Sequence, residues 1–165
     1  MELIPLFLKE FEAEMLTARK MLSRIPDDKY DWQPHPKSMT VRALATHIAD
    51  LPSWVHMALT TEQLDFASAP YNPPIVNNTN DLMEVFEKSV EEGRSQLIPE
   101  NEAKLSESWT LKNGDTIYFV QTKAETIRVS YSQIIHHRAQ LGVYLRLLGV
   151  PLPQSYGPTA DDVNF

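Results

Sequence analysis

Residues 122–149 read TKAETIRVSYSQIIHHRAQLGVYLRLLG, and this stretch determines the expected fold class. Its apolar residues recur in steps of three and four, which is the spacing of one face of an α-helix. The series consists of Ala124, Ile127, Tyr131, Ile134, Leu141, Leu145 and Leu148, with Arg138 at the same spacing. The pattern predicts a long helix from about Thr122 to Leu148, which Gly149 ends.

Three earlier segments have the same periodicity. Helices are expected over residues 4–25, 41–55 and 82–97. Pro26 ends the first, and Pro52 predicts a kink inside the second because proline removes a backbone donor. Capping side chains precede the later two, Ser38 or Thr40 before one and Asn78 or Asn80 before the other.

A hairpin is expected before the last helix. Residues 109–111 and 116–120 are rich in β-forming side chains and flank the pair Asn113-Gly114, which suits a tight turn. Residues 66–74 are rich in proline and small side chains and are expected to form a loop. The sequence therefore predicts an all-α protein, a four-helix bundle with a small β-hairpin, in one domain spanning residues 1–165.

Composition excludes several classes of function. The chain has 15 Lys and Arg against 22 Asp and Glu, a formal net charge of −7, so we expect no nucleic-acid partner. It contains no cysteine, which excludes thiolate nucleophiles and Cys-ligated metals. No apolar run reaches the roughly 20 residues that span a bilayer. The segment 1–10 is acidic and amphipathic, and it lacks the basic start and unbroken apolar stretch of a signal peptide. We expect a cytoplasmic protein without membrane contact.

The common nucleotide-binding, hydrolase and metalloprotease motifs are absent, so histidine placement is the main clue to chemistry. His47 shares a helix face with Leu44 and Leu51, and its imidazole is expected to point into the bundle. Gln133 and His137 lie one turn apart on a polar stripe of the last helix. Facing helices hold metal sites in this way. Imidazole binds Zn, Ni, Cu or Fe, and an amide oxygen is a poorer ligand for them.

The same residues also have a purely structural interpretation. A core histidine that hydrogen-bonds to a neighbour is common, and the residues alone leave both interpretations open. Arg138 is expected either to satisfy a buried carboxylate or carbonyl, or to extend along the surface. Glu14 is expected to face solvent with the other acidic groups of the first helix, with an inward, water-polarising Glu14 as the alternative.

Two stretches resemble a known family. Residues 136–151 (HHRAQLGVYLRLLGVP), followed by YGPTADD at 156–162, resemble the closing segment of DinB-like (DinB/YfiT) proteins. Residues 32–50 (WQPHPKSMTVRALATHIAD) are similar to that family's connection into its second helix. This segment of the family ends in its first histidine. Together the two stretches and the segments between them extend the likeness over essentially the whole chain.

The resemblance implies an up-down-down-up four-helix bundle, often dimeric, in which three histidines hold a divalent metal open to solvent. Two of these ligands correspond to His47 and His137. The third histidine of the family corresponds to position 133, where this chain has Gln133. The implied metal site is therefore His47, Gln133 and His137, with Zn or Ni as the expected ion and weaker binding because of the amide.

The resemblance also implies a class of reaction. Characterised relatives act on low-molecular-weight thiols, as mycothiol-dependent isomerases and bacillithiol-type S-transferases do. The expected function is that of a divalent-metal-dependent transferase or hydrolase that uses such a thiol as its small-molecule substrate. The alternative is a non-catalytic bundle that binds a ligand or partner at a degenerate metal site, which Gln133 favours. A homodimer is expected in either case.

Overall fold

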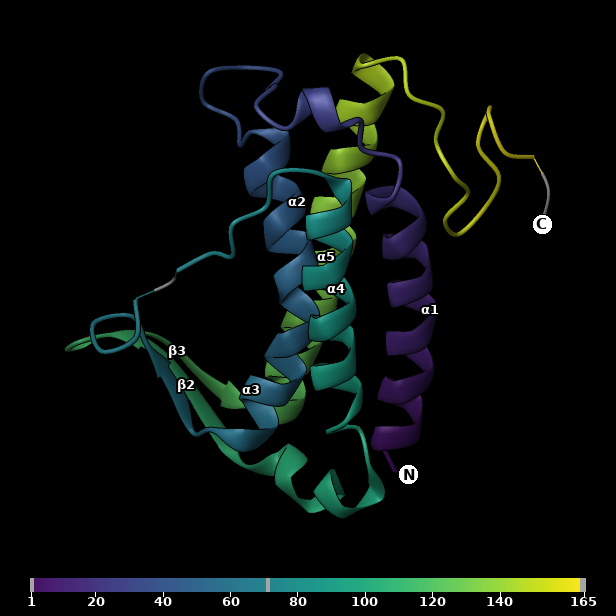
Figure 1. Ribbon diagram of the computed structural model, residues 1–165. Coiled ribbons are helices and arrows are strands. Elements are labelled where there is room, and N and C mark those ends of the chain that lie inside the picture. The colour runs from purple at the N-terminus through teal and green to yellow at the C-terminus, as the bar shows by residue number, and fades with distance from the viewer. Residues whose placement is uncertain (1, 71, 164–165) are drawn as a thin grey trace.

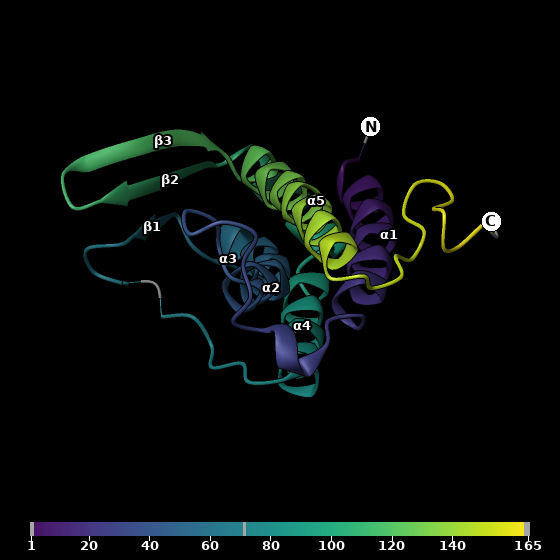
Figure 2. The ribbon, with the colours of Figure 1, turned by 90° about the horizontal axis from the view of Figure 1, so that it is seen from above.

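The computed structural model describes residues 2–70 and 72–163 of the chain. Most of these residues are helical, and the long helices lie side by side (Figure 1). The α-helices are α1 (Ile4–Leu22), α2 (Val41–Asp50), α3 (Trp54–Thr60), α4 (Thr79–Arg94) and α5 (Lys123–Leu147). Short 3-10 helices cover Asp27–Lys29, Leu51–Ser53 and Pro99–Ser106. Viewed from above, α1, α2, α4 and α5 surround a common core (Figure 2).

Side-chain caps explain where three of these helices begin. Thr40 caps α2 and Asn78 caps α4, each through a side-chain oxygen that accepts a hydrogen bond from a backbone N–H three residues later, at 3.1 and 2.9 Å. Thr122 and Glu125 form a reciprocal capping box at the start of α5. These bonds satisfy backbone donors that the first turn of a helix leaves without intrahelical partners. The sequence offered two candidate caps for α2 and two for α4. The structure uses Thr40 for α2 and Asn78 for α4.

The chain bends between α2 and α3, as Pro52 predicted. The two helices are separated by the 3-10 turn Leu51–Ser53, which contains this proline. The bend packs tightly on α4, because a Cβ added to Gly93 would lie only 2.4 Å from the carbonyl oxygen of Pro52. The absence of a side chain at Gly93 therefore lets the bent segment approach the α4 backbone.

The core lies between the helices and consists of apolar side chains with almost no solvent exposure. The faces predicted from periodicity supply most of it. The largest of these fully buried side chains include Phe11, Met15, Leu22, Leu44, Ile48, Leu51, Leu59, Phe86 and Tyr131. Burial of each such side chain contributes about 1.5–3 kcal/mol relative to exposure, so this shared core is the main source of stability.

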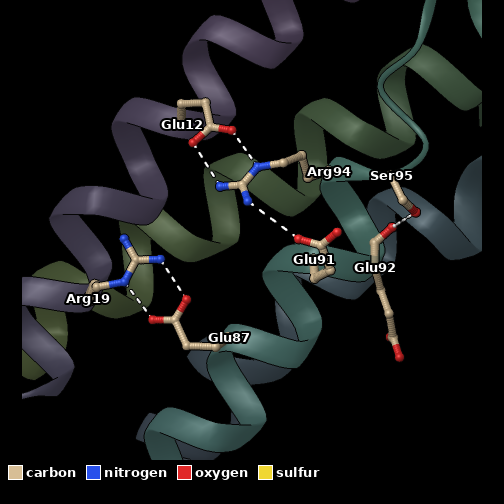
Figure 3. A network of polar contacts seen from close by, with 7 residues as sticks. All are labelled: Glu12, Arg19, Glu87, Glu91, Glu92, Arg94 and Ser95. Atoms are coloured by element: carbon tan, nitrogen blue, oxygen red, sulfur yellow. Dashed lines mark hydrogen bonds and ion pairs between the residues drawn. The ribbon is translucent and has the colours of Figure 1, made fainter.

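Two arginine–carboxylate pairs connect α1 to α4 at the surface (Figure 3). Arg19 donates to both oxygens of Glu87 at 2.5 and 2.7 Å, and Arg94 donates to both oxygens of Glu12 at 2.6 and 3.0 Å. All four side chains are partly exposed to solvent. Exposed pairs of this kind contribute only about 0.2–1 kcal/mol each, so their main effect is to align the two helices.

A small sheet lies beside the helices. Its strands are β1 (Gln63–Asp65), β2 (Ser108–Asn113) and β3 (Thr116–Thr122), in the order β1-β2-β3. β2 and β3 pair antiparallel across Gly114 and Asp115, and Gly114 has a φ of 58°, a left-handed conformation that glycine adopts without steric cost. β1 adds to β2 in parallel.

The described residues are thus mainly helical with a three-stranded sheet, one strand more than the predicted hairpin. β1 has only three residues, too few for a periodic pattern to reveal it. The assignment of residues 1–165 to one domain and the up-down-down-up order of the helices stay predictions. The predicted loop at 66–74 includes residue 71, which lies outside the described residues, while 66–70 and 72–74 contain no helix or strand.

Candidate functional site

Three residues singled out in the sequence lie together in the structure. His47 is on α2, and Gln133 and His137 are one turn apart on α5, the helix that packs against it. All three side chains are partly buried. The apolar stripes of the two helices face each other in the core, and this packing brings the neighbouring polar positions to the same place.

Hydrogen bonds fix the orientation of both imidazoles. Nε2–H of His47 donates to Oε1 of Gln133 at 3.2 Å, and Nδ1–H of His137 donates to Oε1 of Gln140 at 2.9 Å. The two rings meet edge to face, with centroids 4.9 Å apart and planes at 70°. Burial lowers the pKa of His47 below its ordinary 6.5, the hydrogen bond that it donates to Gln133 opposes this shift, and the charge of His137 adds to it.

A pocket of about 440 Å³ opens beside the two histidines. Its volume falls within the roughly 300–1,000 Å³ range of small-molecule sites. Its walls come from the first turns of α2, from the preceding residues and from the segment Pro73–Pro74, and the lining residues are Met39, Thr40, Arg42, Ala43, Thr46, His47, Pro73, Pro74 and His137. A bound molecule would therefore contact two imidazoles, two hydroxyl-bearing side chains and the side chain of Arg42, with apolar residues forming the rest of the wall.

The donor set does not fit a tightly held divalent ion. A histidine ligand must direct a nitrogen lone pair at the metal, and Nε2 of His47 lies 3.2 Å from Oε1 of Gln133 in a hydrogen bond. Within residues 2–70 and 72–163, no group of three or more His, Cys, Asp or Glu side chains could hold a metal ion. Two imidazoles and one amide oxygen remain, which is a poor set for Zn or Ni.

The other three histidines lie outside this arrangement. His136 is exposed, and its ring stands beside that of His137 with centroids 4.9 Å apart. His56 is exposed on α3. His35 is exposed in the connection before α2, where its Nδ1 accepts a hydrogen bond from the backbone N–H of Lys37.

Arg138 and Glu14 form a buried ion pair at a distance of 2.6 Å. The expectation that Glu14 faces solvent is therefore wrong, and Arg138 does satisfy a buried carboxylate. The hydroxyl of Tyr156 completes the cluster, because it donates to Oε1 of Glu14 at 2.7 Å and accepts from Arg138 at 2.9 Å. Glu14 thus bonds to a cation and a phenol instead of polarising a water.

The C-terminal segment is held on a separate part of the molecule. Besides the Tyr156 contacts, Asp161 pairs with Arg146 and accepts a hydrogen bond from the backbone of Leu152. Tyr156 and Leu152 line a different pocket, of about 490 Å³, which shares no residue with the histidine pocket. The segment therefore does not close over His47 and His137.

Sequence reasoning missed the wall formed by Pro73 and Pro74. Proline-rich composition indicated a loop but gave no information about which helix the loop crosses. It also missed Gln140 as the partner that orients His137, although Gln140 is three residues away on the same helix face and belongs to the polar stripe. The three-residue spacing between His137 and Gln140 was the sequence signal that could have predicted this pair.

The structure is that of a mainly helical protein with two facing histidines beside a pocket. Comparison with known sequences places it more closely: the profile of the DinB family matches residues 2–164, and the chain belongs to the DinB family. The resemblance seen in the sequence is thereby confirmed.

Solved structures with a similar fold are also DinB-like proteins. One from Bacillus subtilis is 19% identical with a TM-score of 0.68, covering 90% of this chain and 96% of that one. One from Bacillus cereus is 17% identical with a TM-score of 0.67, covering 91% and 95%. A putative member of the DinB family from Exiguobacterium sibiricum is 17% identical with a TM-score of 0.70, covering 93% and 97%. At these identities the likeness concerns the fold.

No curated protein matches the chain. Among the described residues, none of the helices has both the length and the apolar character needed to cross a lipid bilayer.

Proposed function

We propose that this DinB-family protein binds a small molecule, of the low-molecular-weight thiol class, in the pocket beside His47 and His137. The observation that carries the proposal is the pocket itself, about 440 Å³ in volume, with two oriented imidazoles in its lining. A neutral imidazole offers one donor and one acceptor nitrogen. Such a pair can hydrogen-bond a thiol, and the apolar wall can contact the rest of the molecule.

The proposal takes the protein as a binding member of its family. Gln133 supports this choice, because its amide oxygen is a poor ligand for Zn or Ni at the position where the resemblance implies a third histidine. We further take the long helices as an up-down-down-up bundle, and the protein as a cytoplasmic homodimer, following the family resemblance.

The test is a titration of the metal-free protein, with a chelator present, by N-acetylcysteine as a thiol probe. Two-dimensional NMR should show saturable shifts at Thr46, His47 and His137, and the variant His137→Ala should weaken binding. The variant His56→Ala, which alters an exposed histidine outside the pocket, is the control. Absence of saturable shifts in the wild type, or an equal effect of both variants, would contradict the proposal.

A second candidate is a divalent-metal-dependent transferase or hydrolase that uses a low-molecular-weight thiol. The observation that favours it is the meeting of His47, Gln133 and His137 at one place. If it holds, elemental analysis after exposure to Zn and Ni should find about one ion per chain, lost in His47→Ala and in His137→Ala. A metal-free wild type, combined with strong metal uptake by Gln133→His, would instead identify the amide as the reason for the loss of metal binding.

A further inference from the structure

An acidic pocket lies next to the histidine pocket and belongs to neither of the functions proposed above. It has a volume of about 240 Å³, and its polar lining includes Asp50 of α2 and Ser89 and Glu92 of α4. Pro74 lines both pockets and so forms part of the wall between them. His47 and His137 do not line the acidic pocket.

Two carboxylates face this pocket without a closely bound cation. Burial raises the pKa of Asp50 above its ordinary 3.8, and the negative charge of Glu92 raises it further. Figure 3 shows the Glu92 carboxylate directed away from the arginine pairs that join α1 to α4. Its nearest cation is the exposed Lys88, whose Nζ is 3.9 Å away at the limit of an ion pair. A cation inside the pocket would therefore be stabilised by both carboxylates.

Ser89 provides an independent indication that the pocket receives a polar group. The residue is only 5% exposed, and it lines the pocket. Within residues 2–70 and 72–163, every fully buried side-chain polar atom has a hydrogen-bond partner. The Ser89 hydroxyl has no such partner among these residues, so it is open to the pocket and available to a molecule inside it.

We propose that this pocket binds the ammonium group of a small organic amine. A primary ammonium has three N–H donors and no acceptor. The pocket presents three matching acceptors, the carboxylates of Asp50 and Glu92 and the hydroxyl of Ser89, beside the apolar side chains of Val85 and Pro74, which can contact a short carbon chain.

The chemistry of the pocket favours an ammonium over a divalent metal ion. Ca²⁺ takes six to eight oxygen ligands and Mg²⁺ takes six in a strict octahedron. Among the described residues that line the pocket, the amide of Asn72 is the only further side chain with an oxygen. Lys88 also lines the pocket, so an ammonium group of the chain itself is already tolerated at its edge.

The experiment is a titration of the full-length, isotope-labelled protein with n-butylammonium, followed by two-dimensional NMR. Saturable shifts are expected at Asp50, Ser89 and Glu92. The variants Asp50→Asn and Glu92→Gln should each weaken binding by about tenfold, because each removes a charge-assisted hydrogen bond and keeps the side-chain shape. Ser89→Ala should weaken it less, since it removes a neutral acceptor.

Matched controls separate this site from its alternatives. Glu84→Gln removes the same charge from an exposed position of α4 outside the pocket and should leave the affinity unchanged. His47→Gln should also leave it unchanged, so a failure of the thiol-binding proposal does not affect this test. Equal weakening by Glu84→Gln, equally strong binding of butan-1-ol, absence of saturable shifts, or tighter binding of Ca²⁺ at the same residues would each overturn the proposal.

Discussion

The partial burial of Asp50 disfavours the ionised form of its carboxyl group. Its carboxyl group has a pKa raised mainly by burial and further by Glu92. A raised pKa in the folded state favours the protonated form there, so the folded state loses stability relative to the unfolded chain as the pH rises through the folded pKa. At neutral pH the ionised Asp50 therefore lowers the free energy of unfolding.

The variant Asp50→Asn should consequently be slightly more stable than the wild type at pH 7. The difference should shrink as the pH falls and vanish below about 3.8, where Asp50 is protonated in both states. Thermal unfolding followed by circular dichroism at several pH values measures this. A variant that is less stable than the wild type at pH 7 would contradict the prediction.

Breaking the buried pair of Glu14 and Arg138 should have a much larger effect. Glu14→Ala leaves the Arg138 guanidinium, 3% exposed, with only the Tyr156 hydroxyl and the backbone oxygen of residue 14 as partners. We expect a loss of about 3–5 kcal/mol in the free energy of unfolding, because an uncompensated charge stays buried. Denaturant unfolding measures the loss.

A surface ion pair provides the comparison for that prediction. Glu87→Ala removes the partner of Arg19 at a partly exposed position and should cost at most about 1 kcal/mol. If Glu14→Ala does not fold, Glu14→Gln keeps an acceptor in place and should fold with an intermediate loss. Similar losses for Glu14→Ala and Glu87→Ala would contradict the assigned role of burial.

At the scale of residues, the sequence identified the members of the histidine site but not its bonding. Periodicity placed His47, Gln133 and His137 on facing sides of two helices, and the structure brings them together. Which nitrogen of His47 faces Gln133 depends on side-chain torsion angles, which periodicity does not determine. The burial of Glu14 was missed because its partner Arg138 lies 124 positions away in the sequence.

Gly93 and Gly142 both lie in helices, but a side chain would fit at only one of the two positions. A Cβ at Gly93 would lie 2.4 Å from the Pro52 carbonyl oxygen and 3.1 Å from the Phe11 ring. A Cβ at Gly142 would lie 3.6 Å from the Met21 side chain, an ordinary contact. Since alanine is favoured over glycine in a helix by about 1 kcal/mol, only the surroundings distinguish the two sites.

Gly142→Ala should therefore stabilise the protein by about 0.5–1 kcal/mol. Gly93→Ala should destabilise it by about 1–3 kcal/mol, because α4 must move away from the bent segment around Pro52. Parallel denaturant titrations of the two variants measure both effects. A stabilising Gly93→Ala would show that the bend relaxes without cost.

At the scale of elements, long periodic segments were predictable and short ones were not. The last helix was expected over Thr122–Leu148 and covers Lys123–Leu147. The bend at Pro52 follows from the chemistry of a single residue. β1 exists because it pairs with β2, more than forty residues further along the chain, and a three-residue segment carries no local signal of such a partner.

For the whole molecule, the exposed edge of the sheet affects solubility. β3 is one of the two edge strands, contains no charged residue, and exposes Ile117 by 60% and Val120 by 59%. Uncharged exposed edges pair readily with other chains. The net charge of −7 opposes further association of copies at neutral pH. As the pH falls toward the isoelectric point of about 5.2, the net charge approaches zero, this repulsion weakens, and self-association through β3 is expected.

The variant Val120→Lys should delay this self-association to a lower pH, as measured by light scattering during acidification. Leu16→Lys adds the same charge at a 52% exposed position on α1, away from the sheet. It should have a smaller effect, because it leaves the strand edge uncharged. Identical behaviour of the two variants would attribute the change to net charge alone.

The position of Pro74 between two pockets has a consequence for cooperativity. A molecule in the histidine pocket that displaces Pro74 also changes a wall of the acidic pocket, and the reverse holds equally. Thermodynamic linkage requires the two effects to be equal in free energy. Occupancy of one pocket would thus change the affinity of the other wherever binding displaces Pro74.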